Sequence, residues 1–430
     1  MDEDTLVSST RNSTANDEIP DLEGTTFFFK VCEPNYFTFL CIGMGLLWPW
    51  NCILSASEYF QNDIFHGTSI WANIFTSSMM SVSTVTSLLF NLWLSKRQMA
   101  YSQRVVRGLI LEILVFSLLV AVTFVHSLFP QSLNFIWIMF LVVISAIGTA
   151  LTQNGILAIA NVYGSEYSQA VVLGQAIAGV LPSIVLFLIT FSDKPDNKGS
   201  LIGIILYFLS TSLVSLICIY LFRSNNSDRV LKDTPTSFTE SESLSDNKIF
   251  VPTELLYSKL KYLVLSIFVT FSVTMVFAVF ASTIVARGIP LSDKQYIPLI
   301  FTVWNVGDLC GRFIAELPFF RNDSFTAYKT FVYSLSRIAL LPLFFLFLRI
   351  PKRSPILQDI SYIMLQFIFG LTSGQVISMS FMKIPGALDS DVEREAAGGF
   401  SNVFVSVGLA AGSLLSYVFV FIISKMKQTV

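Results

Sequence analysis

The chain has 430 residues, of which 53% are hydrophobic and 13% are charged, against about 25% charged residues in an ordinary soluble domain. Its net charge of −2 gives no indication of nucleic-acid binding. With only two His residues, a His-based metal site or a catalytic triad is not expected. The five Cys show no metal or disulfide spacing. We therefore expect a membrane protein that is not an enzyme and that uses no metal or cofactor.

The first 35 residues are polar and acid-rich, and they lack the apolar core of a signal peptide. We expect residues 1–35 to form a disordered cytosolic tail, so that the first membrane-spanning helix acts as its own insertion signal.

Eleven segments are long and apolar enough to cross a bilayer, which takes about 20 residues in a helix. They lie near 36–57, 71–95, 105–129, 134–160, 169–192, 200–222, 262–286, 297–318, 327–349, 357–381 and 398–424. A stretch rich in Ser, Thr and acidic residues, 223–258, is predicted to be a disordered cytosolic linker. The sequence thus predicts an all-α integral membrane protein with six helices in 36–222 and five in 259–430. This division resembles two-halved carriers, whose substrate site lies between the halves.

The loop charges predict the orientation, because cytosolic loops carry an excess of Lys and Arg. Lys96, Arg97, Arg104 and Arg107 and the central linker favour a cytosolic N-terminus, although the charges at 349–353 oppose it. An odd number of spans then places the C-terminus on the opposite side.

The eighth predicted helix carries charges inside the membrane. Asp308 and Arg312 are four residues apart, and Phe301 and Asn305 fall on the same helix face. An ionised side chain at the bilayer centre costs roughly 2.5–3.5 kcal/mol on insertion scales, so this face should look into protein or a wet cavity. Its carboxylate, guanidinium and amide suit the hydroxyl pair of a sugar. The structural alternative is a salt bridge that only joins helices. Arg337 in the ninth helix is a further candidate for a salt bridge, one that holds a single conformational state.

Polar and aromatic side chains mark two further helices. Gln153 stands in the otherwise apolar fourth helix, where its amide can pair with a base edge or with a neighbouring helix. Pro49 should kink the first helix, on which Leu47, Trp50 and Leu54 share one face. Trp50 can stack on a flat ligand or pack within the bundle.

The last helix has Asn402, Ser406 and Leu409 on one face, which suits either pore lining or packing.

These motifs resemble those of the equilibrative nucleoside transporter family. The resemblance rests on LLWPWNCILSASEYF in the first helix, Gln153 in the fourth, WNVGDLCGR in the eighth and EAAGGFSNVFVSVGLAAGS in the eleventh. It extends over essentially the whole membrane region. The segments GLLWPWNCILSAS, KLKYLVLSIF and ISMSFMK are most similar to the fungal intracellular branch of the vacuolar membrane.

The resemblance implies a major-facilitator-like fold and alternating access for nucleosides such as uridine and adenosine, with nucleobases as a further substrate class. It implies a vacuolar rather than a plasma membrane, a cytosolic N-terminus and a lumenal C-terminus. Its substrate-binding residues map onto Leu47 and Trp50 beside the base, Gln153 on the base edge, Asp308 and Arg312 on the ribose, and Asn305 and Leu409 next to them. Its gate opposite the cytosol maps onto Leu54, Phe277 and Phe301.

One position departs from the family pattern, because Ala278 follows Phe277 where the family has Pro. The departure bears on gating by the seventh helix and not on the substrate class.

Two rival functions stay open at this point. A proton-coupled nucleoside symporter would use Asp308 as its proton site, but Arg312 beside it favours the ionised form. A receptor or membrane scaffold that transports nothing would use the charges of the eighth helix only for structure. Base preference, the direction of net transport and the oligomeric state are not indicated by the sequence.

Overall fold

The computed structural model describes residues 27–190, 197–225, 250–322, 325–348 and 354–428, and the regular structure in these ranges is helical. The first half holds α1 (Phe27–Cys32), α2 (Pro34–Ser55), α3 (Ser57–Tyr59), η1 (Phe60–Ile64), α4 (Ile70–Ser95), α5 (Tyr101–Val125), η2 (His126–Leu128), α6 (Gln131–Tyr163), α7 (Ser165–Ile189) and α8 (Asn197–Asn225). The second half holds α11 (Thr253–Thr283), α12 (Asp293–Ala315), α13 (Pro318–Arg321), α14 (Ala327–Ser336), η3 (Arg337–Leu340), α15 (Leu341–Phe345), η4 (Leu346–Leu348), α16 (Pro355–Lys383), η5 (Pro385–Ala387) and α17 (Asp391–Gln428).

Ten helices of the described chain are long and apolar enough to cross a membrane. The second predicted span coincides with α4, whose 26 residues reach about 39 Å at 1.5 Å per residue. This helix is rich in Ser, Thr and Asn and is not one of the ten. The all-α membrane architecture is thus confirmed, whereas the count of eleven spans stays a prediction.

The predicted boundaries of the tail and of the linker differ from the structure. Helix α1 and the start of α2 lie inside the predicted tail, because the Glu33 side chain caps α2 by accepting the backbone N–H of Tyr36, and Pro34 occupies its first turn. Helix α11 starts at Thr253, inside the predicted linker, directly after Pro252. Residues 1–26 and 226–249 lie outside the described part of the chain.

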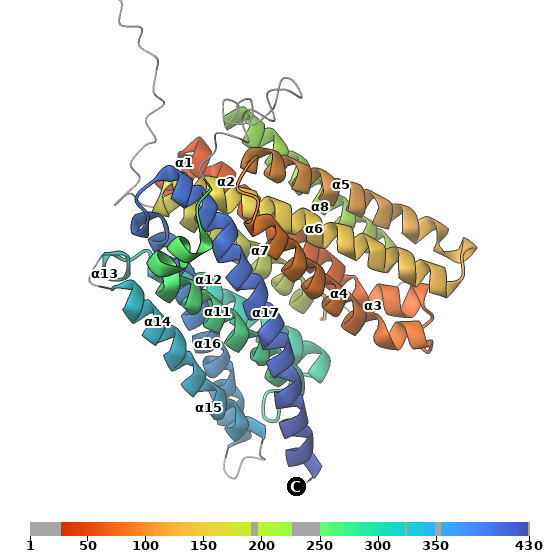
Figure 1. Ribbon diagram of the computed structural model, residues 1–430. Helices are drawn as coiled ribbons and strands as arrows, with labels where there is room; N and C mark the ends of the chain where they lie inside the picture. The colour runs from red at the N-terminus through yellow and green to blue at the C-terminus, as the bar shows by residue number, and fades with distance from the viewer. Residues whose placement is uncertain (1–26, 191–196, 226–249, 323–324, 349–353, 429–430) are drawn as a thin grey trace, which may run out of the picture.

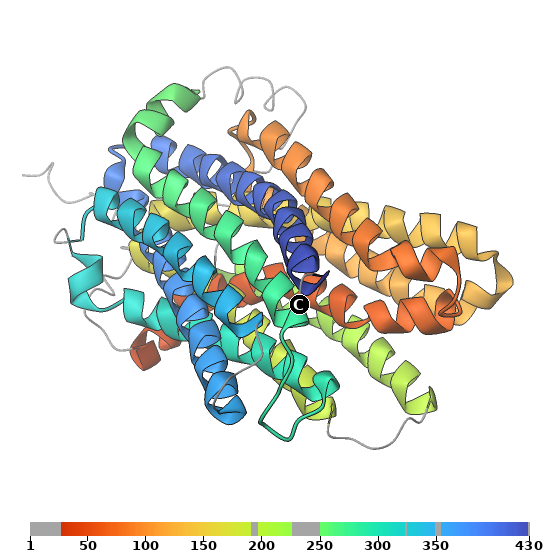
Figure 2. The ribbon, with the colours of Figure 1, turned by 90° about the horizontal axis from the view of Figure 1, so that it is seen from below.

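The helices form two bundles that meet close to α1 (Figure 1). Within the first bundle α2 packs against α7 and α5 against α6, and within the second α12 packs against α16 and α11 against α17. Helix α7 contacts α12 across the two bundles, and α17 contacts both α4 and α6. From this meeting point the bundles diverge, one towards α3 and the other towards α15, and Figure 2 shows the same separation from below. We call the end of the molecule that holds α1 the α1 end.

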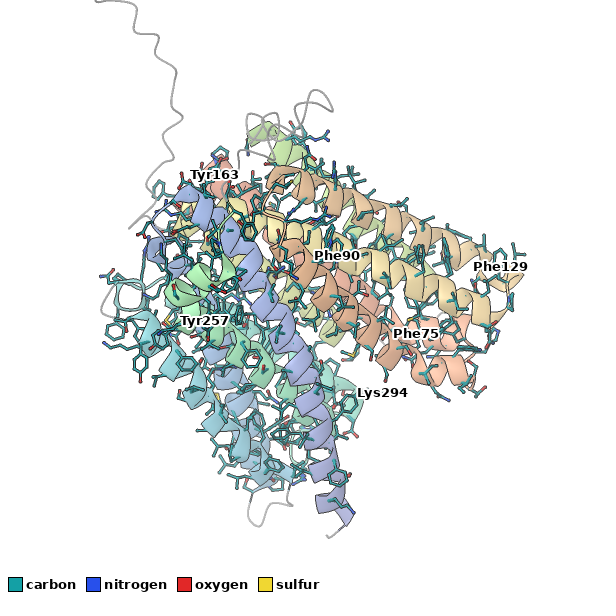
Figure 3. All side chains as sticks on the ribbon, in the orientation of Figure 1. Phe75, Phe90, Phe129, Tyr163, Tyr257 and Lys294 are labelled. Carbon is teal, nitrogen blue, oxygen red and sulfur yellow. The ribbon has the colours of Figure 1, made fainter. Side chains whose placement is uncertain are left out.

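Helix α6 runs the length of the first bundle, so that Tyr163 lies at the α1 end and Phe129 at the far tip (Figure 3). Its residue Gln153 is ten positions before Tyr163, which places it about 15 Å from the α1 end of the helix. Gln153 thus lies inside the bundle, in the third of the helix nearer the α1 end.

Glycines hold α12 and α16 in close contact. A Cβ on Gly311 would lie 1.9 Å from the backbone oxygen of Leu371, and one on Gly374 would lie 1.9 Å from the backbone oxygen of Asp308. Helices in a bilayer approach this closely only where small residues meet. The backbone that carries Asp308 is therefore fixed against α16.

Three helices that pack in series, α2 on α7 and α7 on α12, each contain a proline without being broken by it. Pro49 lies inside α2, Pro182 inside α7 and Pro298 inside α12. Helix α11 runs without interruption through Ala278, so the replacement of the family's Pro leaves the seventh predicted span a continuous helix.

Candidate functional site

Asp308 and Arg312 form a buried ion pair within α12. The Arg312 Nε donates to Asp308 Oδ2 over 2.8 Å, and the two residues are only 5% and 6% exposed. The second carboxylate oxygen, Oδ1, is buried and has no hydrogen-bond partner among the described residues. A buried acceptor left unpaired costs about 1–3 kcal/mol. This oxygen is therefore suited to accept a hydrogen bond from a bound ligand.

Arg312 also connects the two bundles. Its Nη1 donates to the backbone oxygen of Val172 in α7, and the Gln169 amide donates to the backbone oxygen of Arg312 over 2.9 Å. The ion pair is thus held against the first bundle in this state. It combines a structural role with a free carboxylate oxygen.

Asn305 lies one turn from Asp308 and is half-buried. Its amide donates to the backbone oxygen of Phe301 over 3.0 Å, and a Cβ on Gly179 of α7 would lie 2.9 Å from its Oδ1. Asn305 therefore borders the contact between α12 and α7.

The predicted gate residues of the second bundle contact one another. The Phe277 ring meets the Phe301 ring edge-on at 5.4 Å and stacks on Trp304 at 4.3 Å. Trp304 was not among the predicted site residues, yet its buried Nε1 has no partner among the described residues. Leu54, the predicted gate residue on α2, is 36% exposed.

The first bundle contributes unpaired groups of its own. Trp50 on α2 and Gln153 on α6 are both half-buried, and no described residue hydrogen-bonds to either side chain. Leu47 on α2 and Leu409 on α17 are half-buried as well. No hydrogen bond, ion pair or ring contact within the described ranges joins Trp50 or Gln153 to Asp308 or Arg312. Trp50 and Gln153 thus lie on the first bundle, and Asp308 and Arg312 lie on the second. Each bundle carries polar groups without a described partner.

Glu112 in α5 was missed by the sequence analysis. It is 1% exposed, and its carboxylate accepts hydrogen bonds from the hydroxyls of Ser145 and Thr149, each over 2.9 Å. Thr149 precedes Gln153 by one turn of α6, so these bonds fix the rotation of the helix that carries Gln153. The sequence alone could have indicated this residue, because Glu112 is the one acidic residue in the predicted span 105–129.

Arg337 does not form the predicted salt bridge within the described part of the chain. It is 1% exposed, and its guanidinium donates to the hydroxyls of Thr274 and Thr372 and to the backbone oxygens of Thr270 and Phe369. Its cation also lies over the Phe369 ring. The oxygens and the ring satisfy this cation where a carboxylate was expected.

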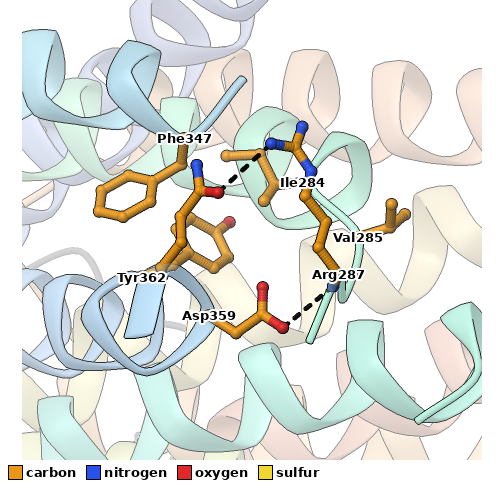
Figure 4. A pocket seen from close by; sticks show the side chains of 7 residues that line it. Ile284, Val285, Arg287, Phe347, Asp359 and Tyr362 are labelled. Atoms are coloured by element: carbon orange, nitrogen blue, oxygen red, sulfur yellow. Dashed lines mark hydrogen bonds between the residues drawn. The ribbon is translucent and has the colours of Figure 1, made fainter. Parts of the chain in front are cut away.

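A small, almost filled pocket lined by Arg287, Asp359 and Tyr362 lies at the other end of the second bundle (Figure 4). Within it, Asp359 Oδ2 accepts backbone N–H groups from Arg287, Gly288 and Ile289 over 3.0, 2.7 and 3.0 Å. Three donors saturate this oxygen and fasten the segment after α11 to α16. We assign this feature to structure, in contrast to the unpaired oxygen of Asp308.

The sequence of the chain is similar to those of known nucleoside transporters. The sequence profile of the nucleoside transporter family matches residues 138–238 and 223–421. The chain is 52% identical to Nucleoside transporter FUN26 of Saccharomyces cerevisiae, over 92% of this chain and 85% of that protein. It is 23% identical to Equilibrative nucleoside transporter 2 of Homo sapiens, over 89% of this chain and 96% of that protein.

Solved structures share the fold at low sequence identity. The major facilitator superfamily proton:xylose symporter XylE matches with a TM-score of 0.63 at 14% identity, over 91% of this chain and 89% of that one. The Escherichia coli fucose:proton symporter FucP matches with a TM-score of 0.55 at 13% identity, over 92% and 94%.

Two helical bundles, with a buried ion pair on α12 where it packs against α7, give this membrane protein the fold of major facilitator superfamily transporters. The family match then makes the assignment specific: the chain belongs to the nucleoside transporter family. The resemblance to the fungal branch is confirmed by the yeast relative, and the protein is a transporter rather than an enzyme.

Proposed function

We propose that this chain carries nucleosides, uridine and adenosine among them, down their gradient by alternating access across the vacuolar membrane. In this proposal the N-terminus is cytosolic and the C-terminus lumenal. The observation that carries the proposal is the buried, unpaired Oδ1 of Asp308 beside the Arg312 guanidinium.

The ribose is assigned to α12. One ribose hydroxyl donates to Asp308 Oδ1, and Arg312 donates to a ribose oxygen while its Nε holds Asp308 Oδ2. Such hydrogen bonds to charged groups are roughly twice as strong as neutral ones. Asn305, one turn away, lies beside the sugar.

The base is assigned to the first bundle. Trp50 and Leu47 supply a flat apolar surface, on which a base stacks without regard to its identity. Gln153 has both a donor and an acceptor in its amide and no described partner, so it can pair with the base edge. Leu409 of α17 completes the lining from the second bundle.

The described state is closed at the α1 end, where the bundles meet. Leu54, Phe277 and Phe301 lie towards the other end, and we assign them to the gate there. Exchange between the two states then requires the bundles to rock about the site, as in other two-halved carriers.

Facilitated transport is favoured over proton symport by the arrangement of Asp308. Its countercharge Arg312 lies on the same helix, four residues away, so the ion pair moves as one unit when the bundles rock. Asp308 therefore keeps the same cation in both states of the cycle, which favours facilitated transport.

The test is uptake by purified protein in liposomes with labelled uridine, adenosine and a free base, with and without a pH gradient. We expect saturable uptake that stops when the concentrations are equal, and the same end point with the gradient. Accumulation driven by the pH gradient would establish symport, and absence of saturable uptake would reject the substrate class.

A further inference from the structure

Four charged side chains meet at the α1 end of the molecule. Lys30 Nζ lies 2.7 Å from Glu166 Oε2 and 3.0 Å from Glu316 Oε2, and Arg321 pairs with Glu166 Oε1. Two cations and two carboxylates balance in charge. Lys30 is 3% exposed, so its ammonium depends on these two partners.

The cluster joins the two bundles through the short helix α1. Glu166 lies in the first turn of α7 in the first bundle, whereas Glu316 directly follows α12 in the second. Phe27, also on α1, meets Phe313 of α12 edge-on at 5.3 Å. Helix α1 thus contacts both bundles, and Lys30 forms one ion pair with each.

These contacts conflict with opening at this end. If the bundles separate here as rigid bodies, Lys30 cannot stay within 3 Å of carboxylates on both of them. One of its ion pairs must break, and the released carboxylate must be solvated by entering water. Both ion pairs therefore favour the state that is closed at the α1 end.

We propose that Lys30 is a gating residue, which fastens the two bundles through α1 and holds the carrier closed at the end assigned to the cytosol. This inference rests on the alternating access of the proposed function. Loss of the Lys30 charge shifts the population towards the state that is open at the α1 end.

The same end of the molecule offers a matched control. Lys259 of α11 also pairs with two carboxylates, Asp389 and Glu393, each over 2.7 Å. All three residues belong to the second bundle. Lys30→Met and Lys259→Met each remove one ammonium from two carboxylates, but only the first change cuts a link between the bundles.

A thiol at position 406 reports the opening. Ser406 of α17 is 5% exposed, and its hydroxyl accepts a hydrogen bond from the Asn91 amide of α4 in the first bundle over 2.7 Å. Ser406→Cys is nearly isosteric. Its rate of reaction with a hydrophilic maleimide, followed by mass spectrometry at this site, measures separation of the bundles without any substrate.

In the Ser406→Cys background we expect Lys30→Met to raise the labelling rate at least roughly fivefold, since loss of even an exposed ion pair can shift an equilibrium by that order. Glu316→Gln, which breaks only the link to the second bundle, should also raise it. Lys30→Arg keeps the cation and should label like the parent, as should Lys259→Met.

Equal labelling of the Lys30→Met variant and its parent would overturn the proposal, and so would an equal rise in Lys259→Met. Because the labelling needs no substrate, a chain that fails to carry uridine can still show the gate. Failure of the proposed substrate and failure of the gate are therefore distinguished.

Discussion

Single polar atoms without a partner point to the site at the scale of residues. Most buried polar groups in proteins are hydrogen-bonded, and Asp359 and Arg337 follow that rule with several partners each. Asp308 Oδ1 does not, and the half-buried amide of Gln153 has no described partner either. Other buried atoms of the described chain, such as Gln169 Oε1 and Asn402 Oδ1, also lack a partner, so the proposal for Asp308 depends on its charge within α12 as well as on its unpaired oxygen.

Replacing Gln153 by Leu removes the amide and keeps most of the volume. If the amide pairs with the base edge, transport should weaken by about 1–3 kcal/mol, or roughly 5–150-fold in KM, and unequally for purine and pyrimidine nucleosides. Thermal stability should not fall, because no described residue loses a hydrogen bond. Uptake of uridine and adenosine by the purified variant, together with its Tm, measures both effects. An equal loss for all substrates together with a lower Tm would identify Gln153 as a packing residue.

The sequence identified the charged residues of the proposed site but not the residues that surround them. Asp308 and Arg312 stand out because ionisable residues are costly in an apolar span. By the same rule Glu112 could have been found. Lys30 could not, because it lies outside every apolar segment, and its burial depends on contacts with residues 136 and 286 positions away.

At the scale of elements, close packing of α12 on α16 sets where Asp308 stands. Periodicity predicted both helices, but the close approach depends on Gly307, Gly311, Gly370 and Gly374 meeting the partner backbone. For helix α4 the pattern predicted a helix that crosses the membrane, and the crossing stays a prediction. Its Ser, Thr and Asn residues keep it out of the ten described helices that are apolar enough to cross a membrane, although it was correctly predicted as a helix.

Gly374→Ala should strongly destabilise the protein, because its Cβ would lie 1.9 Å from the backbone oxygen of Asp308. Overpacking of this kind costs roughly 1–3 kcal/mol or more. The variant should show a lower Tm and weaker uridine transport, since relief of the clash displaces Asp308.

Gly203→Ala in α8 is the matched control, because nothing lies within 4 Å of its added Cβ. It should leave Tm unchanged or raise it, as Ala favours a helix over Gly. Similar Tm values for the Gly374 and Gly203 variants would contradict the close packing of α12 on α16.

At the scale of the whole molecule, two bundles meet at one end, and we propose that the substrate site lies between them. The division into six and five predicted segments follows from the apolar pattern and the polar stretch between them. Which helices of one bundle contact which of the other does not follow from the pattern, since periodicity marks an apolar face but not its partner. The contacts of α7 with α12 and of α17 with α4 and α6 are findings of the structure.

Uridine uptake by the folded double variant Asp308→Asn, Arg312→Gln tests the central claim most directly. Removing both charges leaves no stranded ion, so Tm should stay near that of the parent. Lys259→Met with Asp389→Asn, which removes an ion pair far from the site, should keep normal uptake. We predict uridine uptake close to background for the Asp308 and Arg312 double variant, because the ribose loses both charged partners. Near-normal uptake by that folded variant would show that the ion pair only joins helices, and would contradict the assignment of the site.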